Sequence, residues 1–350
     1  MTVDVSYHCV GSGDWSESPK AGPNNAWDTG DECPRGLVEH ATYIQCLDHG
    51  ADLASAAGDA TQAMAWRKTA SAARAAAEGR WWNSTIGCYG HSCNSQSAQA
   101  LMFGLNVTST AHRTQAIDAL VASITHWNTS YIAGIVGMRF IHEALSDARR
   151  GDLALQLIGR DSSACSGTVS CTFSQWLERG PGSLWEAWDW TEMWSGASAN
   201  HIMFAGGPGV FIHKAAGSTE EFVTMGLNDP EHAGPLAEAT FQVDASIAKH
   251  LGGANLWRED ERGEVMLQWR RNESSCLDVQ IVGPMPRCGR SSWQLFLPVE
   301  LLGAADDGAA LIVESVVGGS LQHTRVSTDR WSVAPTSGTR HEFTVCGTFE

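Results

Sequence analysis

The chain is poor in basic residues and in long apolar runs. Lysine and arginine number 23 against 39 aspartates and glutamates, and the formal net charge is −16. Nucleic acids and anionic membranes attract basic surfaces, so we expect neither as a partner. No stretch reaches the length of a membrane-spanning helix, and residues 1–30 contain no apolar segment of the kind found in a signal peptide.

Several chemical motifs are absent as well. The Gly-Gly-Pro-Gly stretch at 206–209 lies within a helical pattern without a following Lys-Ser/Thr, and no Gly-x-Ser-x-Gly occurs, which argues against nucleotide chemistry and serine hydrolysis. The ten cysteines do not form the doubled Cys-x2-Cys of a zinc site, and no complete ligand set accompanies His91 and Cys93. We therefore expect no metal and no cofactor.

The cysteines instead suggest disulfides. Several stand in close pairs, namely Cys88/Cys93, Cys165/Cys171 and Cys276/Cys288. Short loops closed by disulfides indicate an oxidising compartment. Sequons for N-glycosylation agree with this and occur at Asn83, Asn106, Asn128 and Asn272. We expect a secreted or extracellular glycoprotein, and in that case the signal peptide is missing from this chain.

Apolar spacing divides the 350 residues into two parts. Residues 1–35 are irregular, and from Gly36 onward apolar residues recur at helical spacing. Helices are predicted at about 36–58, 59–77, 96–104, 111–127, 135–148, 151–159, 172–179 and 198–216. Small Ala-rich faces on paired helices favour close antiparallel packing. We predict a toroid of helical hairpins, or part of one, over residues 1–225.

The pattern changes after residue 225. Strands separated by Gly, Pro, Asn or Ser turns are predicted at 239–243, 263–269, 277–282, 293–297, 310–315 and 341–346. This C-terminal part, residues 226–350, is predicted to be an all-β domain, most simply a sandwich.

Tryptophan is the outstanding residue. The 15 tryptophans exceed the 10 phenylalanines and 4 tyrosines taken together, a bias typical of surfaces that stack on carbohydrate. Residues 183–194 place four of them around three carboxylates. A carboxylate among indoles is costly to desolvate, a setting that suits acid–base chemistry on a sugar. Glu186, between Trp185 and Trp188, is predicted to begin a helix and to act as general acid or base. The alternative is a Trp-rich core helix with exposed acids.

Three other residues are candidates for contact with a sugar. His201, after Asn200, could share a pocket with Glu186 across one loop, although a lone His on an apolar face is often an ordinary core residue. Asp14 and Trp15 stand in a Gly-Asp-Trp motif. They would offer a carboxylate to sugar hydroxyls and an indole face to a pyranose ring.

Several motifs occur in a fixed order: Gly-Asp-Trp at 13–15, Ala-Gly-Ile-Val-Gly at 133–137, Gly-Asp-Leu-Ala at 151–154, Phe-Ser-Gln-Trp at 173–176, Gly-Ser-Leu-Trp-Glu-Ala-Trp at 182–188 and Ser-Ala-Asn-His at 198–201. In this order the chain resembles the α-L-rhamnosidases of glycoside hydrolase family 78. The resemblance implies an α + β multidomain chain, with an incomplete (α/α)6 six-hairpin catalytic domain followed by a small β-sandwich domain. It implies hydrolysis of terminal α-L-rhamnose with inversion, and Glu186 as general base. The implied substrate contacts are Asp14, Trp15, Trp185, Trp188 and His201.

One part of the family pattern is missing. The family's general acid lies in a stretch of the form Asp-Cys-Pro-x-Arg-Glu-x-x-Gly-Trp-x-Gly-Asp that precedes Gly-Asp-Trp, and only twelve residues precede Gly13 here. We therefore expect this chain to be poorly active or inactive alone. The alternatives are a carbohydrate-binding remnant without catalysis and another (α/α)6 glycosidase, such as an α-L-fucosidase. The oligomeric state is left open.

Overall fold

The computed structural model describes two sets of residues. In the N-terminal part these are 14, 33–90, 93–162, 172–179, 183–186, 188, 198 and 200–217, and in the C-terminal part 239–243, 251, 253–260, 263–272, 276–282, 293–298, 310–317, 321–327, 330–335 and 340–348. Two compact units are formed, one from 1–148 and 153–208, the other from 149–152 and 209–350. The predicted domain boundary near residue 226 lies outside the described residues and stays a prediction. Trp15 and the Cys165/Cys171 pair also lie outside them.

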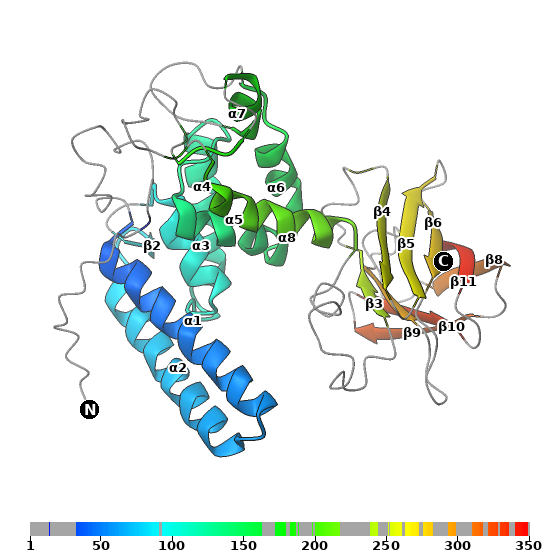
Figure 1. Cartoon of the computed structure of the whole chain (residues 1–350), viewed down its shortest axis with the longest axis horizontal. Helices are drawn as coiled ribbons and strands as arrows, with labels where there is room; N and C mark the ends of the chain where they lie inside the picture. The colour runs from blue at the N-terminus through cyan, green and yellow to red at the C-terminus, as the bar shows by residue number, and fades with distance from the viewer. Residues whose placement is uncertain are drawn as a thin grey trace. The chain divides into compact units, whose positions relative to one another are not determined.

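The first unit is built of helices (Figure 1). They are α1 (Arg35–Ala56), α2 (Ala60–Trp81), α3 (Gln96–Gly104), α4 (Arg113–His126), α5 (Ile135–Asp147), α6 (Gly151–Ile158), α7 (Phe173–Arg179) and the 3-10 helix η3 (Ile202–Ala205). Helix α8 (Gly206–Ala215) follows directly, and most of its residues belong to the second unit. A two-residue ladder between α2 and α3 pairs β1 (Trp82–Asn83) with β2 (Cys88–Tyr89). No helix of the described residues is long and apolar enough to cross a membrane.

Helices α1 and α2 form the long hairpin that Figure 1 shows in blue. The buried side chains of α2 are all alanines, and most of the corresponding face of α1 is small or aliphatic. Two indoles of α2 lie against glycines of α1: a Cβ at Gly50 would be 3.1 Å from Trp66, and one at Gly36 would be 3.1 Å from Trp81. The predicted close packing of Ala-rich antiparallel helices is confirmed.

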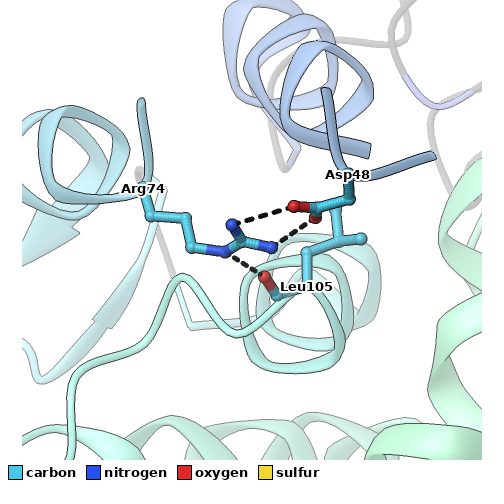
Figure 2. A network of polar contacts seen from close by, with 3 residues as sticks. All are labelled: Asp48, Arg74 and Leu105. Atoms are coloured by element: carbon cyan, nitrogen blue, oxygen red, sulfur yellow. Dashed lines mark hydrogen bonds and ion pairs between the residues drawn. The ribbon is translucent and has the colours of Figure 1, made fainter. Parts of the chain in front are cut away.

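A single guanidinium ties this hairpin to the end of α3 (Figure 2). Arg74 on α2 donates through Nε to the Leu105 carbonyl at 2.9 Å and through its terminal nitrogens to the Asp48 carboxylate of α1, with Nη1–Oδ1 at 3.2 Å. Leu105 caps the C-terminus of α3, where carbonyls lack partners within the helix. The guanidinium that pairs with Asp48 therefore also provides a hydrogen-bond donor to a carbonyl at the end of α3.

The described residues of the second unit form two sheets. The four-stranded sheet has the order β3 (Ala239–Gln242), β7 (Trp293–Pro298), β10 (Arg330–Pro335), β9 (Leu321–Ser327). The five-stranded sheet has the order β4 (Gly253–Asp260), β5 (Gly263–Arg271), β6 (Leu277–Val282), β11 (Arg340–Thr348), β8 (Ala310–Val317). Only β3 and β7 pair in parallel among these strands. The sequence prediction omits β4, β9 and β10, whose polar and glycine residues weaken the apolar alternation.

The two sheets enclose one apolar core. Alternate residues of both sheets are buried in it, among them Phe241, Leu267, Trp269, Ile281, Trp293, Leu295, Val333, Phe343 and Val345. Interdigitation of two inner faces is the packing of a β-sandwich. The predicted sandwich is confirmed.

Two disulfides join described cysteines. Cys88 pairs with Cys93 across the short loop predicted from the sequence. Cys276 pairs with Cys346, 70 residues further along, so its predicted pairing with Cys288 is wrong. The reason is the sheet: β6 begins directly after Cys276 and runs antiparallel beside the part of β11 that contains Cys346. Strand pairing therefore brings these two thiols together.

Candidate functional site

An aromatic stack holds the Trp-rich segment in the first unit. The Trp188 ring lies between Tyr131, with centroids 4.8 Å apart and planes at 13°, and Trp176, at 4.4 Å and 6°. Its Nε1 donates to the Ala133 carbonyl at 2.6 Å. The edge contact with Phe204 at 5.0 Å completes the enclosure, and Trp188 is fully buried. The backbone next to Glu186 is therefore held by side chains from three separate stretches.

Glu186 itself is half-buried and is held by a second backbone stretch. Its N–H donates to the Ser198 carbonyl at 2.9 Å, and the Ser198 N–H donates to Glu186 Oε2 at 2.6 Å. Nearby, the His201 N–H donates to the Leu184 carbonyl at 2.6 Å. The stretches 184–186 and 198–201 thus run side by side. This pairing brings the backbone stretches of Glu186 and the half-buried His201 next to each other, and the pocket expected to be shared by their side chains stays a prediction.

The backbone of these stretches differs from the predicted one. Glu186 does not begin a helix, and the helix expected from residue 198 begins at Ile202. The physical reason is that amide and carbonyl groups of both stretches bond each other, so these groups are not available for helical bonds to the fourth residue back.

Asp14 is fully buried at the N-terminus of α5. Its Oδ1 accepts from the N–H groups of Val136 at 2.8 Å and Gly137 at 3.0 Å. Its Oδ2 accepts from the Gly134 N–H at 2.7 Å and from the Ser97 hydroxyl. Burial raises the pKa of Asp14, although these four donors oppose the rise. The carboxylate therefore satisfies the amides that a helix N-terminus leaves without partners.

Three of the predicted substrate contacts are buried in the structure. Asp14, Trp185 and Trp188 each have 0 % of their surface exposed. They support the stretch that carries Glu186 from within the fold, whereas Glu186 and His201 are only half-buried. Contact of these residues with a sugar stays a prediction. In the part of the chain that the structure describes, no three His, Cys, Asp or Glu side chains gather to hold a metal ion.

Two buried glutamines of α3 belong to the same support. Gln96 Nε2 donates to the Ser130 carbonyl at 2.8 Å, and its Oε1 accepts from the Ile132 N–H at 3.1 Å. Gln99 in the same way bonds both the N–H, at 3.0 Å, and the carbonyl, at 2.9 Å, of Tyr89. Each side-chain amide thus bonds an N–H and a carbonyl of an irregular segment, as the backbone of a neighbouring strand would. Sequence reasoning missed both, because nothing local separates a buried Gln from a surface one.

A buried Tyr–His pair was also missed. The Tyr131 hydroxyl is hydrogen-bonded to His142 Nε2 at 2.8 Å. Burial lowers the pKa of His142 to about 3 and raises that of Tyr131 well above its ordinary value, so both are neutral. The pair fixes Tyr131 on one face of Trp188, and through that ring it contributes to the placement of Glu186.

The family comparison agrees with this architecture. The family model described as the bacterial alpha-L-rhamnosidase six-hairpin glycosidase domain matches residues 3–216. The chain belongs to this family. The expected six-hairpin glycosidase domain, followed by a β domain, is thereby confirmed. No curated protein matches the chain by sequence.

Solved α-L-rhamnosidases share the fold. The structures from Dictyoglumus thermophilum, from Streptomyces avermitilis in complex with L-rhamnose, and from Aspergillus terreus each match 95 % of this chain with a TM-score of 0.65. Their sequence identities to it are 17 %, 18 % and 15 % respectively. This chain covers 34 %, 28 % and 33 % of those chains, so it spans about a third of their length.

Proposed function

We propose that this chain is part of an α-L-rhamnosidase that releases terminal α-L-rhamnose with inversion, and that Glu186 is its general base. The observation that carries the proposal is the pairing of residue 186 with 198 and of 184 with 201, in which the backbone N–H of Ser198 orients a partly exposed Glu186 carboxylate close in the chain to the buried Trp188 stack. Membership of the six-hairpin glycosidase family supports the reaction class.

The geometry suits a base that activates water. One oxygen of Glu186 accepts a hydrogen bond from the Ser198 backbone at 2.6 Å, which orients the carboxylate. In an inverting hydrolase the base removes a proton from water as that water attacks the anomeric carbon. The general acid, a second carboxyl group about 6.5–9.5 Å away, protonates the leaving oxygen.

The surrounding residues have separate roles in this proposal. In this proposal His201 contacts a sugar hydroxyl, and Trp15, which lies outside the described residues, provides an indole face. Asp14 and Trp188 act through the backbone: one anchors residues 134–137, and the other bonds Ala133 and stacks on Tyr131. Misplacement of a catalytic group by about 1 Å can reduce a rate by roughly a hundredfold, so such supports matter for turnover.

The test of the base is Glu186→Gln in the whole α-L-rhamnosidase of which this chain is proposed to be part, assayed with an aryl α-L-rhamnoside. Loss of a general base is expected to reduce kcat by about 10²–10⁴-fold with little change in KM. Glu178→Gln is the matched control, because Glu178 is an exposed glutamate of α7 in the same unit. Turnover by E186Q close to that of the wild type would exclude the assigned role.

The stereochemistry is tested separately. Proton NMR of the first product is expected to show β-L-rhamnose before mutarotation. Retention would refute inversion. If the whole protein binds L-rhamnose and its E186Q variant binds it equally, while neither hydrolyses the rhamnoside, the protein is a carbohydrate-binding relative of the hydrolases.

Secretion is part of the same proposal. The Cys88–Cys93 and Cys276–Cys346 disulfides are of the kind that persists in an oxidising compartment. Among the sequons, Asn106 and Asn128 are exposed residues in the left-handed region, with φ of 53° and 54°. A decrease in mass after treatment with an N-glycosidase would reveal glycans on the protein from its own source.

A further inference from the structure

One peptide unit joins two buried side chains of the first unit. The carbonyl of Ala133 accepts a hydrogen bond from Trp188 Nε1 at 2.6 Å. The N–H of the same peptide unit, that of Gly134, donates to Asp14 Oδ2 at 2.7 Å. Because the C=O and the N–H of a trans peptide point to opposite sides, the peptide links the two side chains in one series of hydrogen bonds. We call the Asp14 carboxylate, this peptide and the Trp188 indole the peptide relay.

The segment that contains this peptide is buried and irregular. Residues 130–134 are all buried and precede α5 without forming helix or strand. Gln96 of α3 bonds the backbone of the first and the third of them, and Asp14 Oδ1 bonds two N–H groups in the first turn of α5. Since no regular secondary structure fixes residues 130–134, these side chains determine where the Ala133 carbonyl points.

Trp188 connects the peptide relay to the proposed base. Its ring also stacks on Tyr131, which belongs to the same irregular segment, with centroids 4.8 Å apart. Glu186 comes directly after Trp185 and two residues before Trp188, and both indoles have 0 % of their surface exposed. Buried rings thus hold the backbone on both sides of Glu186, so a displacement of Trp188 would displace the carboxylate as well.

The charge of Asp14 strengthens the bond to Trp188 across the peptide. A hydrogen bond to a charged acceptor is about twice as strong as one between neutral groups. Hydrogen bonds in series polarise one another, by about 10–30 % for each bond. An ionised Asp14 therefore makes the Ala133 oxygen a better acceptor for the indole N–H than a neutral side chain would. The Ser97 hydroxyl donates to the same Oδ2 and so competes with the Gly134 N–H for that oxygen.

We propose that Asp14 is a positioning residue for Glu186 and acts through the Ala133–Gly134 peptide and the Trp188 indole. The part that concerns Glu186 rests on the proposed function, whereas the peptide relay itself does not depend on hydrolysis. Asp14 and Trp188 are then one coupled support of the base, and not two independent ones. The complete burial of Asp14 agrees with a role that needs no contact with a sugar.

The first test is NMR of the full chain labelled with 15N at tryptophan, which needs no turnover. Among the signals of the 15 indoles, that of Trp188 is the one missing from Trp188→Phe, a variant that keeps an aromatic ring in the stack. A stronger hydrogen bond moves an indole proton downfield. Asp14→Asn removes the charge and should move the Trp188 signal upfield. Ser97→Ala removes the competing donor and should move it downfield, so the two variants have opposite signs.

The matched control is Arg74→Met, which breaks the ion pair of Figure 2 in the same unit. The hydrogen bonds of Arg74 go to Leu105 and Asp48, so this variant should leave the Trp188 signal in place. An unmoved signal in folded Asp14→Asn, or shifts of the same sign in Asp14→Asn and Ser97→Ala, would overturn the inference. If Asp14→Asn does not fold, the milder Ser97→Ala decides, and an upfield or absent shift there counts against the peptide relay.

The second test is a double-mutant cycle in the whole α-L-rhamnosidase, with an aryl α-L-rhamnoside as substrate. Asp14→Asn and Trp188→Phe should each lower kcat by about tenfold or more and change KM by less than about twofold. The double variant should lose little more than the weaker single variant, because both changes act on one series of bonds. Losses that multiply would refute the coupling and leave Glu186 as the base. Absence of hydrolysis by the whole wild-type protein would refute the proposed function, while the NMR result would still decide on the peptide relay.

Discussion

Replacing Asp14 tests whether this residue anchors α5. Four donors, the N–H groups of Gly134, Val136 and Gly137 and the Ser97 hydroxyl, converge on its carboxylate. In Asp14→Ala all four lose their acceptor in a fully buried place. Removal of one partner from a buried charged cluster typically costs about 3–5 kcal/mol. A domain has only about 5–15 kcal/mol of stability in total, so the effect should be large.

The variant Asp14→Asn should lose only part of this stability. One carbonyl oxygen remains to accept from two donors, while the new NH2 group faces the other two, so we expect a loss of about half as much as in Asp14→Ala. Ser97→Ala removes a single donor and should cost about 1 kcal/mol. The free energy of unfolding is measured by urea titration with circular dichroism at 222 nm, which reports mainly on the helices of the first unit.

The expected loss in free energy of unfolding is largest for Asp14→Ala, smaller for Asp14→Asn and smallest for Ser97→Ala, because this is the order of the number of hydrogen bonds lost. If Asp14→Asn left the free energy of unfolding within about 0.5 kcal/mol of the wild type, the anchor would be refuted. A raised KM for rhamnoside with unchanged stability would instead favour direct contact with the sugar.

The pH dependence gives an independent check. The pKa of Asp14 is raised in the folded protein, so the stability that this group contributes is present at low pH and is lost as the pH rises through the folded-state pKa. The variant Asp14→Asn has no such loss. The gap in stability between wild type and variant should therefore narrow as the pH rises from about 4. A gap that widens would contradict a raised pKa.

Three other perturbations have defined outcomes. Gly137→Ala should destabilise the protein by about 2–3 kcal/mol or more in urea unfolding, because the new Cβ would be 2.1 Å from Ser97 Oγ and 2.7 Å from its Cα. The control Gly79→Ala places a Cβ with nothing within 4 Å and should be neutral or stabilising. Replacing both Cys276 and Cys346 by Ser should lower the free energy of unfolding of the second unit by about 4 kcal/mol, measured by thermal unfolding. The control Cys46→Ser removes an exposed free thiol and should leave the unfolding temperature unchanged. In the wild type, the free energy of unfolding falls between about pH 6.5 and 3, because the imidazole of His142 is protonated in the unfolded chain before it is protonated in the folded one. The variant His142→Gln should show a less steep fall. An equally steep fall would show that another group titrates.

Much of the fold could be read from local patterns. The helices of the first unit follow from apolar spacing and alanine content, and six of the nine strands that the described residues of the sandwich form follow from alternation between turn residues. The strands that were missed, β4, β9 and β10, carry polar residues or glycine at positions where burial depends on the facing sheet. Cys276 shows the same limit, because its partner is set by the register of β6 with β11.

The candidate site divides in the same way. Residue types near one another in the chain are enough to single out Glu186 and His201, since a carboxylate among indoles and a histidine one loop away suggest sugar chemistry. Sequence could not show that Asp14 anchors α5, that Trp188 lies between Tyr131 and Trp176, or that Ser198 orients Glu186. These contacts join residues far apart in the chain. Local propensity depends on near neighbours, whereas the burial of a carboxylate or an indole depends on which distant backbone comes to meet it.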